Sequence, residues 1–168
     1  STLMAVLGVS ALGVSALMGC GGDGAAIPSD SFVTDIRPAI AAVESELGPG
    51  QQYFEVTANR QVTNLFVAVD GATAAVPYVY LNGELQPPAP KLMGASGYAF
   101  SADAVDFDED LILAAVEREL ADSSIEALSI EAGNGGIVRY VVSTLSPEGG
   151  RLDVTVAADG AVLEVDPV

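Results

Sequence analysis

Carboxylates are the densest group of side chains in this sequence that could do chemistry. The run DAVDFDED over residues 103–110 contains Asp103, Asp106, Asp108, Glu109 and Asp110. Oxygen ligands at this density could hold Ca²⁺, but the spacing lacks the mid-loop glycine and terminal glutamate of an EF-hand loop. The alternative is a helix start, in which Asp108 caps the first turn and Phe107 packs against Ile112. We favour the helix start and expect no metal and no cofactor.

Four aromatic side chains form a second candidate site. We expect the aliphatic residues of three strands over 53–81 to face a covering helix. Because side chains alternate between the two faces of a strand, four rings should then lie on the opposite face of the sheet: Tyr53, Phe66, Tyr78 and Tyr80. Aromatic side chains supply much of the contact energy at interfaces, so this face predicts binding of a protein partner or an apolar ligand. The alternative is that residues 91–105 or the second half of the chain bury these rings.

The remaining residue types argue against several function classes. The sequence contains no histidine, which is the commonest general base near neutral pH and the commonest metal ligand. No nucleophile elbow of the G-x-S-x-G type occurs, and no glycine-rich phosphate loop precedes a helix. The formal net charge of −17 repels phosphate backbones and suppresses self-association. We therefore expect a monomer that is not an enzyme and has no nucleic-acid partner.

The single cysteine, Cys20, follows an uncharged apolar run and precedes the glycine-rich stretch GGDGAA. The motif Leu17-Met18-Gly19-Cys20 resembles the bacterial lipobox, in which the cysteine sulfur is lipidated and the chain is cut before the cysteine. The resemblance implies a signal peptide over 1–19, a lipidated Cys20 with a flexible tether over 20–31, and a lipid anchor on the extracytoplasmic side of the cell membrane. The alternative is an uncleaved transmembrane anchor. Because the sequence opens at Ser1 without a basic stretch, we expect its start to be trimmed.

Two helices and two groups of strands must position these residues. Apolar residues spaced by three and four predict one helix that ends at Gly48-Pro49-Gly50 and another that includes Ile112, Val116 and Leu120. Strands are predicted over 53–58, 62–69, 76–81, 125–132, 137–145, 151–158 and 162–165. Asn82-Gly83 and Asp159-Gly160 are typical of tight turns between strands.

The two groups of elements follow similar segments. Residues 41–47 read AAVESEL and residues 114–120 read AAVEREL. This similarity predicts an α+β fold of two tandem repeats, each a helix packed on its own antiparallel meander sheet of three to four strands. The first repeat would span 32–90, a linker 91–108, and the second repeat 109–168. Val43 and Val116 should occupy equivalent buried positions.

A second resemblance concerns the end of the chain. The order of a helix, a meander and a final strand pair resembles the PepSY type of repeat, and the residues that carry the resemblance are Leu152, Val154, Val156, Asp159, Gly160, Val162 and Val165. That resemblance implies a non-catalytic binding or inhibitory module. The leading hypothesis is therefore a membrane-tethered, extracytoplasmic interaction module. The alternatives are a carrier of an apolar ligand such as a lipid, which needs an internal cavity, and last an enzyme that uses carboxylates.

Overall fold

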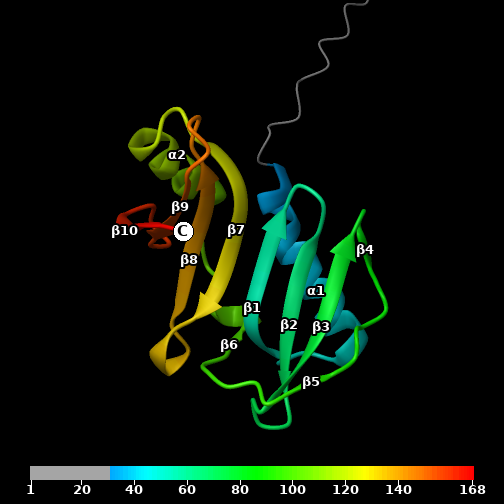
Figure 1. Cartoon of the computed structure of the whole chain (residues 1–168). Helices are drawn as coiled ribbons and strands as arrows, with labels where there is room; N and C mark the ends of the chain where they lie inside the picture. The colour runs from blue at the N-terminus through cyan, green and yellow to red at the C-terminus, as the bar shows by residue number, and fades with distance from the viewer. Residues whose placement is uncertain (1–30) are drawn as a thin grey trace, which may run out of the picture.

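The computed structural model describes residues 31–168, so the predicted signal peptide and Cys20 lie outside the described residues. The described chain forms one antiparallel sheet of ten strands with two short helices (Figure 1). In the first half, a 3-10 helix η1 (Ser31–Asp35) and α1 (Ile36–Leu47) precede four strands: β1 (Gln52–Asn59), β2 (Thr63–Val69), β3 (Ala74–Leu81) and β4 (Glu84–Leu85). In the second half, α2 (Glu109–Glu119) precedes β7 (Ser124–Ala132), β8 (Val138–Leu145), β9 (Arg151–Val156) and β10 (Val162–Pro167).

The predicted division into two tandem helix-on-sheet repeats is wrong. The strand order is β10-β9-β8-β7-β1-β2-β3-β4, so a single sheet runs through both halves of the chain. The halves join where β1 pairs antiparallel with β7, with Glu55 opposite Glu131 and Val56 opposite Ile130. The first strand of a meander has one edge whose backbone N–H and C=O groups have no partner strand. Here β1 and β7 are both first strands, and their free edges hydrogen-bond to each other.

Both helices cover the same face of this sheet. The two AAVE segments are helical as predicted, and Val43 and Val116 are 0% and 1% exposed. Across the joint, Val56 and Ile130 are fully buried in one continuous core cluster. α1 lies behind β1, β2 and β3 in the view of Figure 1. The face toward the viewer carries no helix of the described chain.

Arg37 connects the two helices. Its guanidinium donates to the Glu109 carboxylate at 2.5 Å and to the backbone carbonyl of Phe107 at 2.6 Å. The same guanidinium lies 4.5 Å from the centre of the Phe107 ring, within reach of a cation–π interaction. The start of α2 is thereby attached to the start of α1, although more than sixty residues separate them in the sequence.

The acidic run begins α2, as predicted. The Asp108 carboxylate accepts a hydrogen bond from the backbone N–H of Leu111 at 3.1 Å, and Phe107 and Ile112 are both buried. Within residues 31–168, no group of three or more acidic, cysteine or histidine side chains is placed to hold a metal ion. Helices of the described chain are all too short or too polar to cross a membrane.

Residues 91–108, which we predicted to be a linker, contribute to the sheet and the core. β5 (Leu92–Met93) pairs with β3, and β6 (Phe100–Ser101) pairs with β1. The Phe100 ring is 1% exposed and its centre lies 5.8 Å from that of Tyr53. A 3-10 helix, η2 (Ala102–Ala104), then leads toward α2, and another, η3 (Asn134–Gly136), lies between β7 and β8.

Candidate functional site

The predicted aromatic face does not form. Tyr53, Tyr78 and Tyr80 lie on the face that α1 covers, and only Phe66 lies on the opposite face. On β2 and β3, Leu65 pairs with Tyr78, and Leu65 is fully buried against α1. Phe66 pairs with Pro77 on the other side. The structure therefore separates Phe66 from the other three rings and turns those three toward α1.

Two local features explain why the tyrosine side chains of β1 and β3 point to the sheet face opposite to the one predicted. Between Tyr53 and Glu55 the register of β1 against β2 shifts by one residue, so Phe54 is the extra residue of a β-bulge. The bulge puts Tyr53 on the same buried face as Val56, and both are 0% exposed. On β3 the sequence AAVPYVYL is apolar at every position, so alternation could not decide which side faces the helix.

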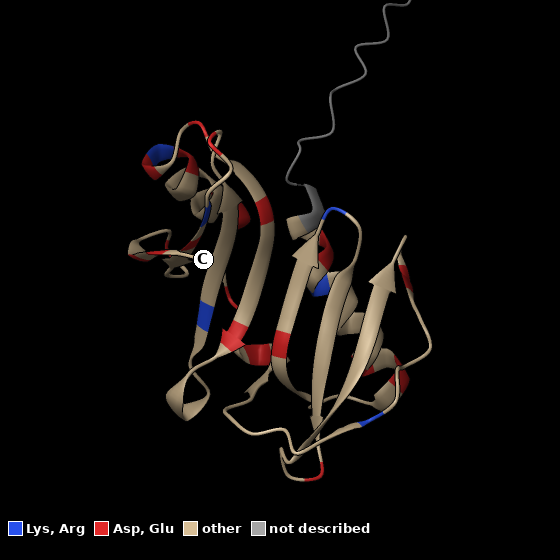
Figure 2. Cartoon of the chain, viewed as in Figure 1, with Lys and Arg blue, Asp and Glu red and all other residues tan. Residues whose placement is uncertain are grey.

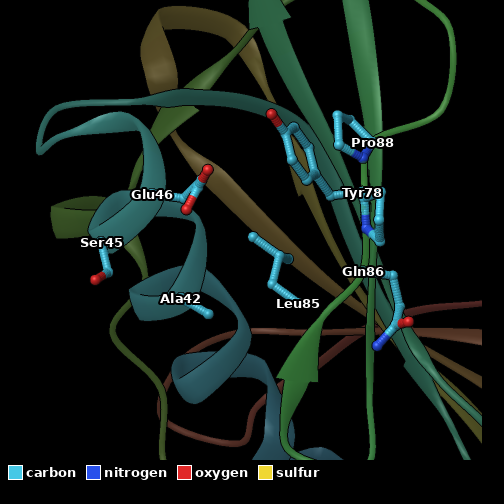
Figure 3. A pocket seen from close by; sticks show the side chains of 8 residues that line it. Ala42, Ser45, Glu46, Tyr78, Leu85, Gln86 and Pro88 are labelled. Atoms are coloured by element: carbon cyan, nitrogen blue, oxygen red, sulfur yellow. The ribbon is translucent and has the colours of Figure 1, made fainter.

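The reversal places Tyr78 at a groove between α1 and the segment that follows β3. The groove has a volume of about 530 Å³ and is open to solvent. Figure 3 shows it between one wall of α1 and a second wall of extended chain. It is lined by Ala42, Ser45 and Glu46 from α1, by Tyr78 from β3, and by Leu85, Gln86, Pro87 and Pro88.

Backbone hydrogen bonds hold the second wall in place. The N–H of Gln86 donates to the Val79 carbonyl at 2.8 Å, and the N–H of Ala89 donates to the Pro77 carbonyl at 2.9 Å. The wall thus continues along the outer edge of β3 between its pairings with β4 and β5. Consecutive prolines stiffen this extended stretch. The groove is consequently preformed in the folded chain.

Tyr78 is the most deeply buried side chain of this groove. It is 6% exposed, and its hydroxyl makes no hydrogen bond to any residue from 31 to 168. In Figure 3 the ring rises from β3 into the space beside α1. The hydroxyl oxygen is not one of the fully buried unpartnered polar atoms of residues 31–168, so it reaches the open side of the groove. A ligand in the groove could therefore hydrogen-bond it.

Glu46 faces the same space from α1 (Figure 3). Its carboxylate is solvent-exposed and forms no ion pair with a basic side chain of the described part of the protein. Leu85 and Pro88 supply apolar surface on the opposite wall. The groove therefore combines one negative charge, the unpartnered Tyr78 hydroxyl and a largely apolar opposite wall.

Tyr53 has a different environment. Its hydroxyl is fully buried, and within residues 31–168 it is the one fully buried side-chain polar atom without a hydrogen-bond partner. Burial raises the pKa of the Tyr53 phenol above its usual range, and the nearby Glu44 carboxylate raises it further. Because the side chain is 0% exposed, Tyr53 cannot contact a ligand in the groove.

Two further pockets lie in the second half. An apolar one of about 560 Å³ is lined by the start of β8 and by segments beside β8, β9 and α2, and includes the exposed side chains Ile137 and Leu163. An acidic one of about 570 Å³ surrounds the start of α2. In the acidic pocket, Asp108 caps the helix and Glu109 pairs with Arg37. Those two carboxylates are thus already used by the fold.

No protein-family model, curated protein or solved structure matches this chain. The lipobox and PepSY-type resemblances accordingly stay predictions. Sequence reasoning missed Glu46, Leu85 and Pro88 as site residues. The signal that could have found them is Pro87-Pro88-Ala89-Pro90, a stiff extended stretch directly after the Asn82-Gly83 turn.

Proposed function

We propose that the protein is a membrane-tethered, extracytoplasmic lipoprotein that acts as a non-catalytic interaction module through the α1 groove. The observation that carries the binding role is Tyr78, a nearly buried side chain whose hydroxyl has no partner among residues 31–168 and borders the groove. The motif LMGC and the glycine-rich residues after it support the tether. A stiff, preformed groove favours binding because little conformational entropy is lost on association.

A protein without histidine must use other groups for acid–base chemistry near neutral pH. Among residues 31–168, Glu46 is the only acidic side chain that lines the groove, so this part of the chain places no pair of carboxylates there for acid and base roles. These features support a binding role over a catalytic one.

The binding role can be tested by site-specific photo-crosslinking in native membranes. A benzoylphenylalanine at Ser45, on the groove, should trap a partner protein, whereas the same group at the exposed Tyr98 should not. Ala42→Trp, which fills the groove from α1, should abolish the Ser45 crosslink while leaving the thermal melt nearly unchanged. Equal crosslinking with and without the Ala42→Trp change would contradict the proposal.

The tether has its own test. Mass spectrometry of the membrane-extracted protein should find an acylated Cys20 at the mature N-terminus, and Cys20→Ala should release the protein from membranes. Cys20→Ser should release it as well, because serine keeps the size of the side chain but cannot form the thioether. An intact Ser1–Gly19 segment on the mature protein would contradict lipidation.

The alternative function, carriage of an apolar ligand such as a lipid, is favoured by the apolar pocket around Ile137 and Leu163. Its volume lies in the range of small-molecule sites. The space between α1 and the sheet, by contrast, is filled by side chains such as Val43, Leu65 and Val67, each fully buried. Native mass spectrometry of the purified chain would detect a co-purifying lipid, and Leu163→Lys should displace it.

A further inference from the structure

The walls of the α1 groove differ in chemistry in a way that selects a ligand. One wall and the floor present oxygen atoms, namely the Glu46 carboxylate and the Tyr78 hydroxyl. The other wall presents the hydrocarbon of Leu85, Pro87 and Pro88. Gln86 also lines this wall, and its side-chain amide donates to the Glu84 carbonyl at 3.3 Å. A ligand that fills this space needs a hydrogen-bond donor, a positive charge and an apolar stem.

The described part of the chain supplies no cation of its own to Glu46. Five of the six basic side chains already pair with other carboxylates: Arg37 with Glu109, Arg60 with Glu126, Lys91 with Asp70, Arg118 with Glu119 and Arg139 with Glu131. The net charge of −17 adds a favourable long-range field for a cationic partner (Figure 2). Glu46 is thus available to an external positive charge.

We propose that the groove binds a lysine side chain presented by a partner protein. The inference rests on the proposed interaction function and names the chemistry of its partner. The lysine ammonium donates to the Glu46 carboxylate and to the Tyr78 hydroxyl, and its methylene stem packs on Leu85 and Pro88. A compact ammonium with three donors suits one carboxylate and one hydroxyl better than the planar guanidinium of arginine, which prefers two coplanar acceptors.

The Tyr78 hydroxyl is accessible from the groove and has no hydrogen-bond partner among residues 31–168, so it is available to the lysine ammonium. With the ammonium in place, the hydroxyl accepts a charge-assisted hydrogen bond, which is about twice as strong as one between neutral groups.

The test is an NMR titration of the full chain in detergent with N-acetyl-lysine N-methylamide. Saturable shifts should centre on the amides of Glu46, Tyr78 and Leu85. The neutral isostere N-acetyl-norleucine N-methylamide should bind at least about tenfold more weakly, because it lacks the charge. Equal binding of the two probes would overturn the proposal.

Matched variants separate a specific site from general attraction to an acidic surface. Glu46→Gln should weaken the lysine probe about tenfold, whereas Glu119→Gln removes the same charge near the end of α2 and should leave binding unchanged. Tyr78→Phe should weaken binding about fivefold, with Tyr98→Phe as its control. Equal losses from Glu46→Gln and Glu119→Gln would show a non-specific electrostatic effect and refute the site.

The combined results of the titration and the crosslinking show whether the lysine proposal or the interaction function fails. If 1,5-diaminopentane binds more than about tenfold tighter than the capped lysine, the ligand is a free amine and the lysine proposal is wrong. If the Ser45 crosslink forms but the lysine probe does not bind, the interaction function stands and the ligand class is refuted. If the probe binds but no crosslink forms, the interaction function fails instead.

Discussion

The two halves of the sheet repeat one order of elements but use their buried tyrosines differently. In the second half, the Tyr140 hydroxyl donates to the Asp106 carbonyl at 2.9 Å and accepts from the Asp106 N–H at 3.1 Å. In the first half, neither Tyr53 nor Tyr78 forms a hydrogen bond through its hydroxyl with any residue from 31 to 168. The second half uses a buried tyrosine to hold its own fold, whereas the first half leaves the Tyr78 hydroxyl without a partner at the groove and the Tyr53 hydroxyl without one in the core. This contrast points to the first half as the binding half.

The two halves also differ in how closely a tight turn packs against the rest of the fold. Gly83, between β3 and β4, and Gly160, between β9 and β10, have nearly the same backbone φ, +82° and +86°. A β-carbon at Gly83 would meet nothing within 4 Å. One at Gly160 would lie 2.9 Å from the backbone carbonyl oxygen of Leu111, in the first turn of α2. The second half therefore packs its turn against its helix, and the first half leaves its turn in open space.

The largest predicted effect compares these two turns. Gly160→Ala should lower the free energy of unfolding by about 2–4 kcal/mol, since a left-handed conformation and a close contact with Leu111 add together. Gly83→Ala should cost only about 1 kcal/mol, because it carries the conformational strain alone. Urea denaturation of both variants measures the difference. Equal losses would mean that the β9–β10 turn is not packed against α2.

The next prediction compares the hydroxyls of Tyr140 and Tyr78. Tyr140→Phe should lower the free energy of unfolding by about 1–2 kcal/mol, because it removes two hydrogen bonds and leaves the Asp106 backbone groups without their partner. Tyr78→Phe should change it by less than about 0.5 kcal/mol, since that hydroxyl has no partner to lose. Thermal melts of both variants test the comparison. A larger loss for Tyr78→Phe would remove the distinction between the halves.

Local chemistry allowed much of the fold to be predicted. The Asn82-Gly83 turn adopts positive φ at both residues, as a two-residue hairpin requires, and Asp108 caps α2 as expected. These features depend on residues close in the sequence. Helix periodicity likewise identified the buried faces of Val43 and Val116.

The candidate site and the single sheet depend on a β-bulge and on a strand pairing that local sequence patterns do not predict. The bulge at Phe54 inverts the alternation of β1, and nothing in YFEVTA distinguishes a bulged strand from a regular one. The pairing of β1 with β7 joins residues about seventy positions apart, and it depends on which edges remain free. The groove follows from both, because it needs Tyr78 turned toward α1.

A third prediction uses pH. A tyrosine phenol in water ionises near about pH 10. Burial raises the pKa of both Tyr53 and Tyr140 above this usual value in the folded chain. Above about pH 10 the unfolded chain loses a phenol proton that the folded chain keeps, so stability falls as pH rises. For Tyr53 the slope should approach about 1.4 kcal/mol per pH unit above about pH 10, and urea denaturation between about pH 9 and pH 11 measures the fall in stability.

Single substitutions show how much each half of the chain contributes to this change of stability with pH. Tyr53→Phe and Tyr140→Phe should each make this fall in stability shallower, because each removes a phenol whose pKa is raised by burial. A slope unchanged by Tyr53→Phe would mean that the Tyr53 phenol ionises in the folded chain as readily as in the unfolded chain.

The smallest expected effect has the opposite sign from that of Tyr140→Phe. At neutral pH, Tyr53→Phe should leave the free energy of unfolding unchanged or raise it by up to about 1 kcal/mol, because it removes a buried hydroxyl that has no partner and keeps the ring. The Phe100 contact at 5.8 Å stays available to the new ring. Because the same chemical change should destabilise the protein at position 140, parallel denaturation curves give a direct comparison of sign. Destabilisation by more than about 1 kcal/mol at position 53 would show that this hydroxyl is satisfied, and the first half would no longer be the one that leaves its buried tyrosines unpaired.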